Sequence, residues 1–387
     1  MGFGLVAFSH AEEKLGGEAA SLPVKSGPWG IMEVYDIDLE PPENYVSYIL
    51  EQEDRPITWC FTGIRAPELP ELLKSIGLNS DQIQRLSDPD LIRQFDDRVE
   101  VIPPRELVKS LTSEVRVQLY QVQSMDPEYP RYQSTFYIDP RWRKEVAEIP
   151  GIQPQTVESV TSLFYPRGRG TQLSELPLIL GELKEDSERR LLVRSLLRER
   201  SLAVRLKIGA GSDHRFLTEY WSARGKNQGM VPLMEAVLKR GDLEHYDLVH
   251  LLPPLPRMLL YTYRDASLVV GNSSPDCFWT AANFFNQEPS GRFLDDLPFA
   301  SALEELYHRV SEPSEFGDLV LMIDETLGYG VHACNYIAGD LVFTKNGRSF
   351  SQPWVINTLE EVIKRYSTKP GVTVKYFRLN SEFSQKS

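Results

Sequence analysis

Three short strands near the carboxyl end constrain the fold most. A Gly317-Asp318 turn leads into a continuous apolar run, which is typical of a strand buried on both faces. Two further runs flank the turn Ala338-Gly339-Asp340 and are expected to pair as a hairpin. An antiparallel sheet is therefore expected, formed by Leu319–Ile323, His332–Ile337, Leu341–Thr344 and Val372–Arg378.

The chain has 387 residues, more than one ordinary core accommodates, so two domains are expected. Prolines 253, 254 and 256 form the clearest boundary signal. We expect a flexible lead-in at 12–28, an N-terminal region at 29–256, a second domain at 257–380 and a tail at 381–387. The N-terminal region carries signals of a mixed α/β or mainly helical unit, and no motif in it indicates a function.

Within that region, local patterns predict several elements. Strands are expected at 30–39, before Pro41-Pro42, at 57–61, and at 204–208. Helices are expected at 67–76, which ends at Gly77, and after the Asn79-Ser80-Asp81 cap. Further helices are expected at 103–119, from Leu176 or Ser187 to Leu197, and at 220–238 with an interruption at 225–229.

Charge and hydropathy exclude two classes of partner. The net charge is −13, and a nucleic-acid-binding protein needs clustered Lys and Arg, so no nucleic-acid partner is expected. No run reaches the roughly 18 apolar residues of a membrane-spanning helix. Residues 1–11 resemble the end of a signal peptide without its basic start, which predicts export; an apolar tail on a cytoplasmic protein is the alternative.

The three cysteines, Cys60, Cys277 and Cys334, are too few for a disulfide framework. Cys277 differs from the others because the turn-rich segment 271–276 delivers it to the start of an apolar helix. Partial positive charge at a helix N-terminus favours a thiolate, and the unpaired N–H groups there can stabilise an oxyanion. A buried packing role is the alternative for a cysteine in this position.

Taken in order, Asp276-Cys277, Gly317-Asp318-Leu319-Val320 and His332 resemble the motifs of NlpC-type, papain-like cysteine peptidases. In that family an Asp-Cys pair opens the catalytic helix, the Gly-Asp motif opens the first core strand, and the catalytic His begins the next. The resemblance covers about residues 260–366. It implies an α+β fold, with a papain-like C-terminal domain beside the larger N-terminal region.

The resemblance implies that Cys277 is the nucleophile and His332 its base. A third polar group on the next strand should orient the imidazole. Thr344 stands at that position, and Asn346 has the same strand parity; its carbonyl oxygen favours Asn346. Asp276 and, near the oxyanion site of the family, Tyr261 or Tyr263 are further candidates, with packed aromatics as the alternative.

Two functions remain open from the sequence. One is a cysteine hydrolase that cleaves an amide bond in peptide or peptidoglycan-like substrates. The other is a non-catalytic binding or scaffold protein that keeps the fold without a complete triad, since neither Thr344 nor Asn346 is the family's usual histidine. His245 and His250 are five residues apart, which does not suit a metal pair on one helix face. Neither a metal nor a cofactor is expected, and the sequence does not indicate an oligomeric state.

Overall fold

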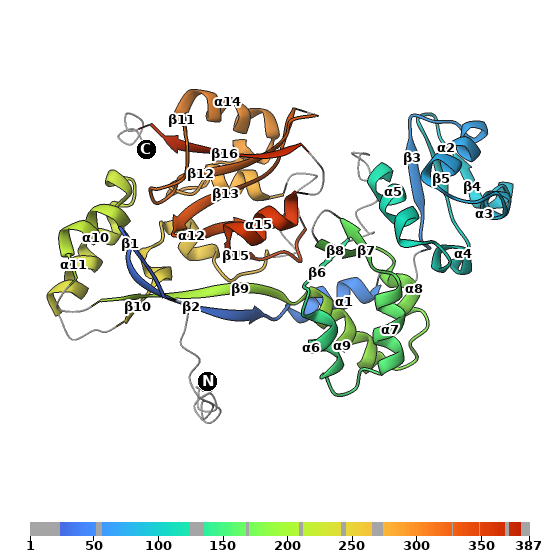
Figure 1. Ribbon diagram of the computed structural model, residues 1–387, viewed down its shortest axis with the longest axis horizontal. Helices are drawn as coiled ribbons and strands as arrows, with labels where there is room; N and C mark the ends of the chain where they lie inside the picture. Colours follow the sequence, from blue (N-terminus) through green and yellow to red (C-terminus); the bar gives the residue numbers. More distant parts are fainter. Residues whose placement is uncertain are drawn as a thin grey trace, which may run out of the picture.

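A computed structural model describes residues 24–51, 56–123, 135–167, 170–208, 212–240, 245–264, 274–326, 328–347, 349–367 and 371–380 (Figure 1). The signal-like run at 1–11, most of the lead-in and the tail at 381–387 lie outside the described residues. The end of the expected lead-in forms a strand, β1 (Val24–Gly27). Among the described helices, none combines the length and apolar character needed to cross a bilayer. The fold is mixed α/β.

A long antiparallel ribbon extends across the molecule. Strand β2 (Gly30–Leu39) coincides with the predicted strand and pairs with β9 (Glu199–Lys207) from Ile31↔Lys207 to Leu39↔Glu199. Strand β1 pairs with β2 at one edge, and β10 (His245–Asp247) pairs with β9 at the other. In Figure 1 this ribbon lies along the lower side and connects α10 and α11 at one end with α6 and α9 at the other.

The predicted antiparallel sheet near the carboxyl end is present with six strands. Their order is β11 (Tyr307–Val310), β16 (Val372–Leu379), β12 (Leu319–Asp324), β13 (Tyr329–Ala338), β14 (Leu341–Lys345) and β15 (Trp354–Thr358). All four predicted strands are confirmed. Gly339 has a φ of 65° in the β13–β14 turn, a conformation that glycine adopts without strain.

Helices cover the two faces of this sheet. Helix α13 (Cys277–Ala282) lies on the face that presents Leu321 and Ala333, whereas α15 (Leu359–Tyr366) lies on the face that presents Met322 and Cys334. Helix α14 (Asp296–Leu306), preceded by the 3-10 turn η7 (Gly291–Leu294), adds to the α13 side. The carboxyl-terminal sheet is therefore buried between two layers, as its apolar runs require.

Residues 45–197 enclose a separate hydrophobic core, here called the first core. Its small sheets are β3 (Trp59–Thr62), β5 (Arg98–Val101) and β4 (Ile92–Gln94), and β6 (Phe136–Ile138), β8 (Gly170–Leu173) and β7 (Tyr165–Arg167). Its helices are α1 (Glu43–Glu51), α2 (Leu69–Ile76), α3 (Ser80–Leu86), α4 (Arg105–Lys109), α5 (Ser113–Gln123), α6 (Trp142–Ala147), α7 (Pro154–Ser162), α8 (Leu176–Leu180) and α9 (Asp186–Leu197), with 3-10 turns at η1 (Ala66–Glu68) and η2 (Pro89–Leu91).

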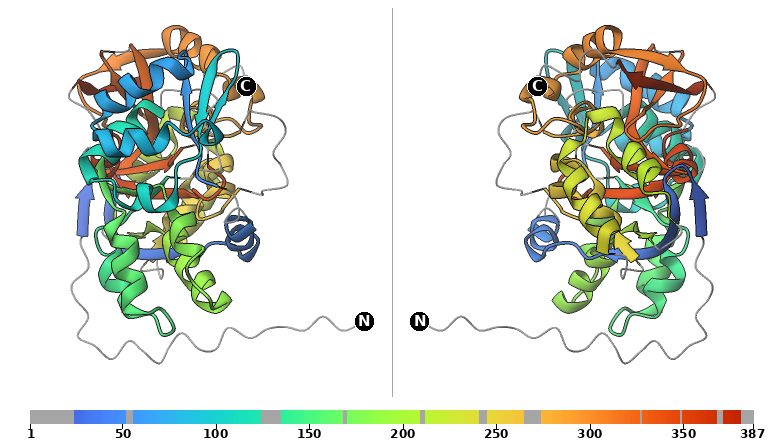
Figure 2. Two further views of the ribbon diagram at one scale, coloured as in Figure 1. Left: turned by 90° about the vertical axis from the view of Figure 1, so that its right-hand side faces the viewer. Right: turned by 90° about the vertical axis from the view of Figure 1, so that its left-hand side faces the viewer.

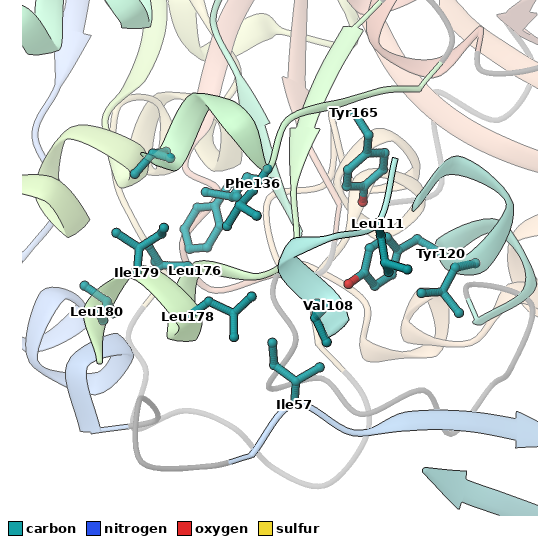
Figure 3. Packing of buried hydrophobic residues seen from close by; sticks show 14 of the residues in the cluster. Ile57, Val108, Leu111, Tyr120, Phe136, Tyr165, Leu176, Leu178, Ile179 and Leu180 are labelled. Carbon is teal, nitrogen blue, oxygen red and sulfur yellow. The ribbon is translucent and has the colours of Figure 1, made fainter. Parts of the chain in front are cut away.

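Aromatic packing and one buried ion pair hold the first core together. Tyr120 and Tyr165 stack with ring centroids 5.2 Å apart (Figure 3). Arg116 Nε donates to Glu175 at 2.9 Å, and the Tyr120 hydroxyl donates to the same carboxylate at 2.8 Å. Both charged side chains are almost fully buried, so the free energy of unfolding depends on the pair staying intact.

One further core, here called the second core, lies on both sides of residue 257, where we expected the domain boundary. It joins Met32 and Val34 of β2 and residues 202–255 to the α13 face of the carboxyl-terminal sheet. The helices between β9 and the sheet are α10 (His214–Trp221), η3 (Ala223–Gly225), η4 (Gln228–Met230), α11 (Val231–Arg240), η5 (Leu248–Leu251) and α12 (Pro254–Leu259). In the right-hand view of Figure 2, α10 and α11 face the viewer below the orange helix α14.

Candidate functional site

Cys277 is the first residue of helix α13, as expected. Asp276 is the N-cap, and its side chain accepts a hydrogen bond of 2.9 Å from the backbone N–H of Trp279. An aspartate at this position satisfies one of the free N–H groups of the first turn. Asp276 therefore has a structural part, because it fixes where the helix begins.

The sulfur of Cys277 lies against backbone N–H groups. The N–H groups of Ala333, on β13, and of Phe278 act on the thiol to lower its pKa, since both favour the thiolate. Burial outweighs them: Cys277 is only 5% exposed, and burial together with the Asp276 carboxylate raises its pKa to about 12. The thiol is therefore protonated in this arrangement.

His332 lies on β13 and is fully buried. Its Nε2 atom lies 2.9 Å from the hydroxyl of Thr344 on β14, and its ring stacks on Tyr366 of α15 with centroids 3.8 Å apart. Its other ring nitrogen, Nδ1, is buried and has no hydrogen-bond partner among the described residues. Burial and the Arg365 guanidinium lower the pKa of His332 to about 3, so the imidazole is neutral.

The Cys277 thiol and the His332 ring pack against opposite faces of the sheet, because successive residues of a strand alternate between its faces. Ala333, whose N–H faces the sulfur, packs with the α13 side, whereas the His332 ring stacks on α15 at the opposite face. Because Nδ1 is unpaired, no hydrogen bond joins it to the sulfur of Cys277. Cys277 of α13 and His332 of β13 thus do not form the direct pair that we expected.

Thr344, and not Asn346, occupies the third position. Thr344 is fully buried and bonds to His332, whereas both amide atoms of Asn346 are buried without a partner among the described residues. The reason is that β14 ends at Lys345, so Asn346 lies beyond the regular strand although it has the same parity. The sequence-based preference for Asn346 was therefore wrong.

Tyr261 and Tyr263 do not point to an oxyanion site. The hydroxyl of Tyr261 donates to the carbonyl of Leu202 at 2.8 Å, and that of Tyr263 donates to the carbonyl of Leu39 at 2.9 Å. Both carbonyls belong to the β2–β9 ribbon, so these side chains connect the ribbon to the segment before α13. The packed alternative describes them better than the oxyanion role.

The sequence did not point to Lys345, the residue between Thr344 and Asn346. Its side chain is fully buried, and its ammonium group donates to the carbonyls of Gly347 and Ser349, each at 2.8 Å. Burial, followed by the charge of Arg264, lowers the pKa of Lys345 to about 7, although the nearby Cys277 and Asp276 act to raise it. Strand alternation in the sequence could have indicated its position, because it places Lys345 on the α13 face of the sheet, opposite Thr344.

The Gly317-Asp318 motif has a structural part in this fold. Asp318 is buried, pairs with Arg378 of β16 at 2.7 Å, and accepts from the N–H groups of Ser314 and Glu315. Gly317 has a φ of 88°, and an added Cβ there would lie 2.2 Å from the ring of Phe285. The motif therefore anchors the start of β12 behind the C-terminal end of α13.

Cys334 packs in the core on the α15 side of the sheet. Cys334 is buried at the α15 face beside Met322 and Val342, and burial raises the pKa of its thiol. This agrees with a core role.

Within the described parts of the chain, no three His, Cys, Asp or Glu side chains come together to hold a metal ion.

Comparison with known proteins gives no further assignment. No family model, curated protein or solved structure matches this chain. Functional conclusions therefore depend on the motifs and on the geometry of this site alone.

Proposed function

We propose that the chain is a papain-like cysteine hydrolase of the NlpC type, which cleaves an amide bond with Cys277 as nucleophile and His332 as base. The hydrogen bond between His332 and Thr344 supports this proposal, although the His332 ring stacks on α15 and not on α13. Its Nε2 atom is hydrogen-bonded to Thr344, while Nδ1 is buried and unpaired. His332 is the neighbour in sequence of Ala333, whose backbone N–H faces the sulfur of Cys277. An imidazole that is held at one nitrogen and free at the other is arranged as a general base.

In the proposed mechanism Nε2 of His332 carries a proton at rest, and Nδ1 receives the thiol proton during the attack. With Nε2–H donating to Thr344, Nδ1 carries the lone pair and accepts the thiol proton as the sulfur attacks the substrate carbonyl. The imidazolium then protonates the departing amine, leaving a thioester that water hydrolyses. The backbone N–H groups beside the sulfur supply partial positive charge while negative charge develops.

In the resting site the Cys277 thiol and the His332 imidazole are both buried and uncharged. The pKa of about 12 for Cys277 and of about 3 for His332 keep the proton on sulfur. Proton transfer therefore requires a movement of the free protein that brings the two side chains within hydrogen-bond distance. A preformed thiolate–imidazolium pair is not part of the proposal.

The same burial favours a second candidate function. Cys277 is 5% exposed and His332 is 0% exposed, and threonine replaces the residue types usual for the third position. A binding or scaffold protein that retains the papain-like fold would have these properties. In that case Cys277 and His332 are packing residues, and replacing either changes stability but not any bond-cleaving activity.

Cleavage of stem peptides from peptidoglycan tests the first candidate, because cell-wall peptides are the substrates that the resemblance implies. Purified full-length chain is incubated with these peptides, and new amino termini are detected by mass spectrometry. Cleavage by the wild type that is lost in Cys277→Ser and His332→Gln, and retained in Cys334→Ser, supports the hydrolase. Cleavage that survives Cys277→Ser contradicts it.

Action on cell-wall peptides also implies export, which is part of this proposal. The signal-like run at 1–11 supports it. Mass spectrometry of the protein from its native cells should find an N-terminus near Glu12. An intact Met1 in the cytoplasmic fraction would count against export.

A further inference from the structure

A cavity lies at the carboxyl-terminal end of helix α13. It has a volume of about 500 Å³ and includes Ala281 and Ala282, at the carboxyl end of the helix, but not Cys277 at its start. Helix α14 forms another wall, and the loop at 225–229 closes the side toward α10 and α11. Figure 1 shows α14 beside β11, at the sheet edge away from α15. The cavity is thus separate from the Cys277–His332 site.

The walls of this cavity are partly apolar and aromatic, and polar side chains such as Asn286 and Gln287 also line it. The apolar part is formed by side chains of η7, α14 and the segment after α13: Phe284, Phe285, Phe293, Phe299, Leu303 and Leu306. Its volume is within the range of about 300–1,000 Å³ that is usual for small-molecule sites in proteins. An apolar ligand body would therefore exchange water for these side chains, which is favourable.

The charged groups of the cavity have one sign. Lys226 and Arg292 line it, and no aspartate or glutamate is among the described residues that do, although the whole chain carries a net charge of −13. Lys226 donates to the carbonyl of Leu379 at 3.1 Å and forms no ion pair with a described carboxylate. Burial lowers its pKa, although the carboxylates of Glu315 and Asp318 act to raise it, so an anion at this position would further stabilise the charged ammonium.

We propose that this cavity binds a carboxylate with a single hydrocarbon body, of the medium-chain fatty acid class. The hydrocarbon lies among the aromatic and leucine side chains, and the carboxylate meets Lys226 and Arg292 at the polar end. A neutral ligand would bring no negative charge to Lys226 and Arg292, and a cationic one would be repelled. The inference does not depend on the hydrolase proposal, because it uses none of the residues of that site.

Calorimetric titration of the full chain with dodecanoate, below its micelle concentration, tests the proposal. Dodecanol and dodecylammonium serve as neutral and cationic ligands of the same length. Wild type should bind one dodecanoate, bind dodecanol more weakly, and not bind dodecylammonium. Lys226→Gln should weaken dodecanoate roughly tenfold, as expected for loss of a charge-assisted hydrogen bond, and leave dodecanol unchanged.

Lys239→Gln is the matched control, because Lys239 is 80% exposed on α11, and it should bind like the wild type. A filling variant, Ala302→Phe, places a ring in the cavity and should abolish binding of both ligands. Because Lys226→Gln leaves the apolar core untouched, the test does not depend on the filling variant folding. Absence of saturable dodecanoate binding to the wild type, or equal binding by Lys226→Gln, would overturn the proposal.

Discussion

The Nε2 atom of His332 and the hydroxyl oxygen of Thr344 lie 2.9 Å apart on neighbouring strands β13 and β14. This bond fixes the imidazole in one orientation and leaves Nδ1 as its only unpaired ring nitrogen. A threonine hydroxyl accepts or donates a single hydrogen bond here, and it carries no charge. It can therefore orient the imidazole but cannot stabilise an imidazolium as a carboxylate would.

Replacing Thr344 by valine should lower the free energy of unfolding by about 1–3 kcal/mol, because His332 Nε2 would be left buried and unpaired. Thr344→Ser keeps the hydroxyl and should lose less. Urea denaturation at pH 7 measures both. A larger loss in Thr344→Ser than in Thr344→Val would mean that the methyl group, and not the hydrogen bond, holds this position.

His332 should make the protein sensitive to mild acid. Its pKa of about 3 lies below the unfolded value near 6.5, so between these pH values the unfolded chain binds a proton that the native chain does not. Stability therefore falls as the pH decreases below 6.5. Relative to His332→Asn, the wild type should lose about 2 kcal/mol between pH 6.5 and pH 5. The control His214→Asn, at an exposed histidine, should keep the full loss.

Lys345 should have the corresponding effect at higher pH. Its pKa of about 7 lies below the unfolded value near 10.5, so above pH 7 the native chain releases a proton that the unfolded chain keeps. Stability attributable to this group therefore rises with pH, by roughly 3 kcal/mol from pH 7 to pH 9. Lys345→Met should remove that rise in urea denaturation. Lys239→Met, at an exposed lysine, should retain it. An unchanged profile in Lys345→Met would contradict the lowered pKa that burial gives this ammonium.

Gly317→Ala should destabilise the chain by about 2–4 kcal/mol. The φ of 88° is unfavourable for alanine, and the new Cβ would lie 2.2 Å from a ring carbon of Phe285. Gly291→Ala is the matched control, because φ there is not positive and nothing lies within 4 Å of an added Cβ. Thermal unfolding of both variants measures the difference. A loss of stability in Gly291→Ala as large as in Gly317→Ala would contradict this account.

The sequence predicted the elements whose signals are local. Pro41-Pro42 ends β2, Gly77 ends α2 with a φ of 106°, and Gly339 makes the turn before β14. The helix expected at 103–119 is instead two helices, α4 and α5, because the chain turns at 110–112. Between Leu176 and Leu197 both suggested starts are real, since α8 ends before α9 begins.

Long-range pairing could not be predicted in the same way. The β2–β9 ribbon joins segments that are far apart in sequence, and it connects Met32 and Val34 to the core around α13. Local sequence patterns predict that a segment forms a strand, but they do not predict which distant strand it pairs with. For this reason a boundary drawn from prolines near residue 257 does not reveal that one core lies on both sides of it.

In the site, the sequence located Cys277 and His332 because a cap residue and a hairpin are local features. It could not choose between Thr344 and Asn346, which have equal parity, because only the end of β14 distinguishes them. It also could not reveal that Lys345 is buried, since alternation assigns a face of the sheet but not what covers that face.

Iodoacetamide labelling at pH 8, read by peptide mass spectrometry, tests the central claim most directly because it needs no known substrate. Cys60, Cys277 and Cys334 are all buried, so burial alone protects all three. With a pKa of about 12, Cys277 has very little thiolate at this pH, and its reaction requires a base. The account predicts that Cys277 is labelled at least about tenfold faster than the other two, and that His332→Ala removes this advantage. Labelling of Cys277 no faster than of Cys334, or an unchanged rate in His332→Ala, would contradict the assignment of this pair as nucleophile and base.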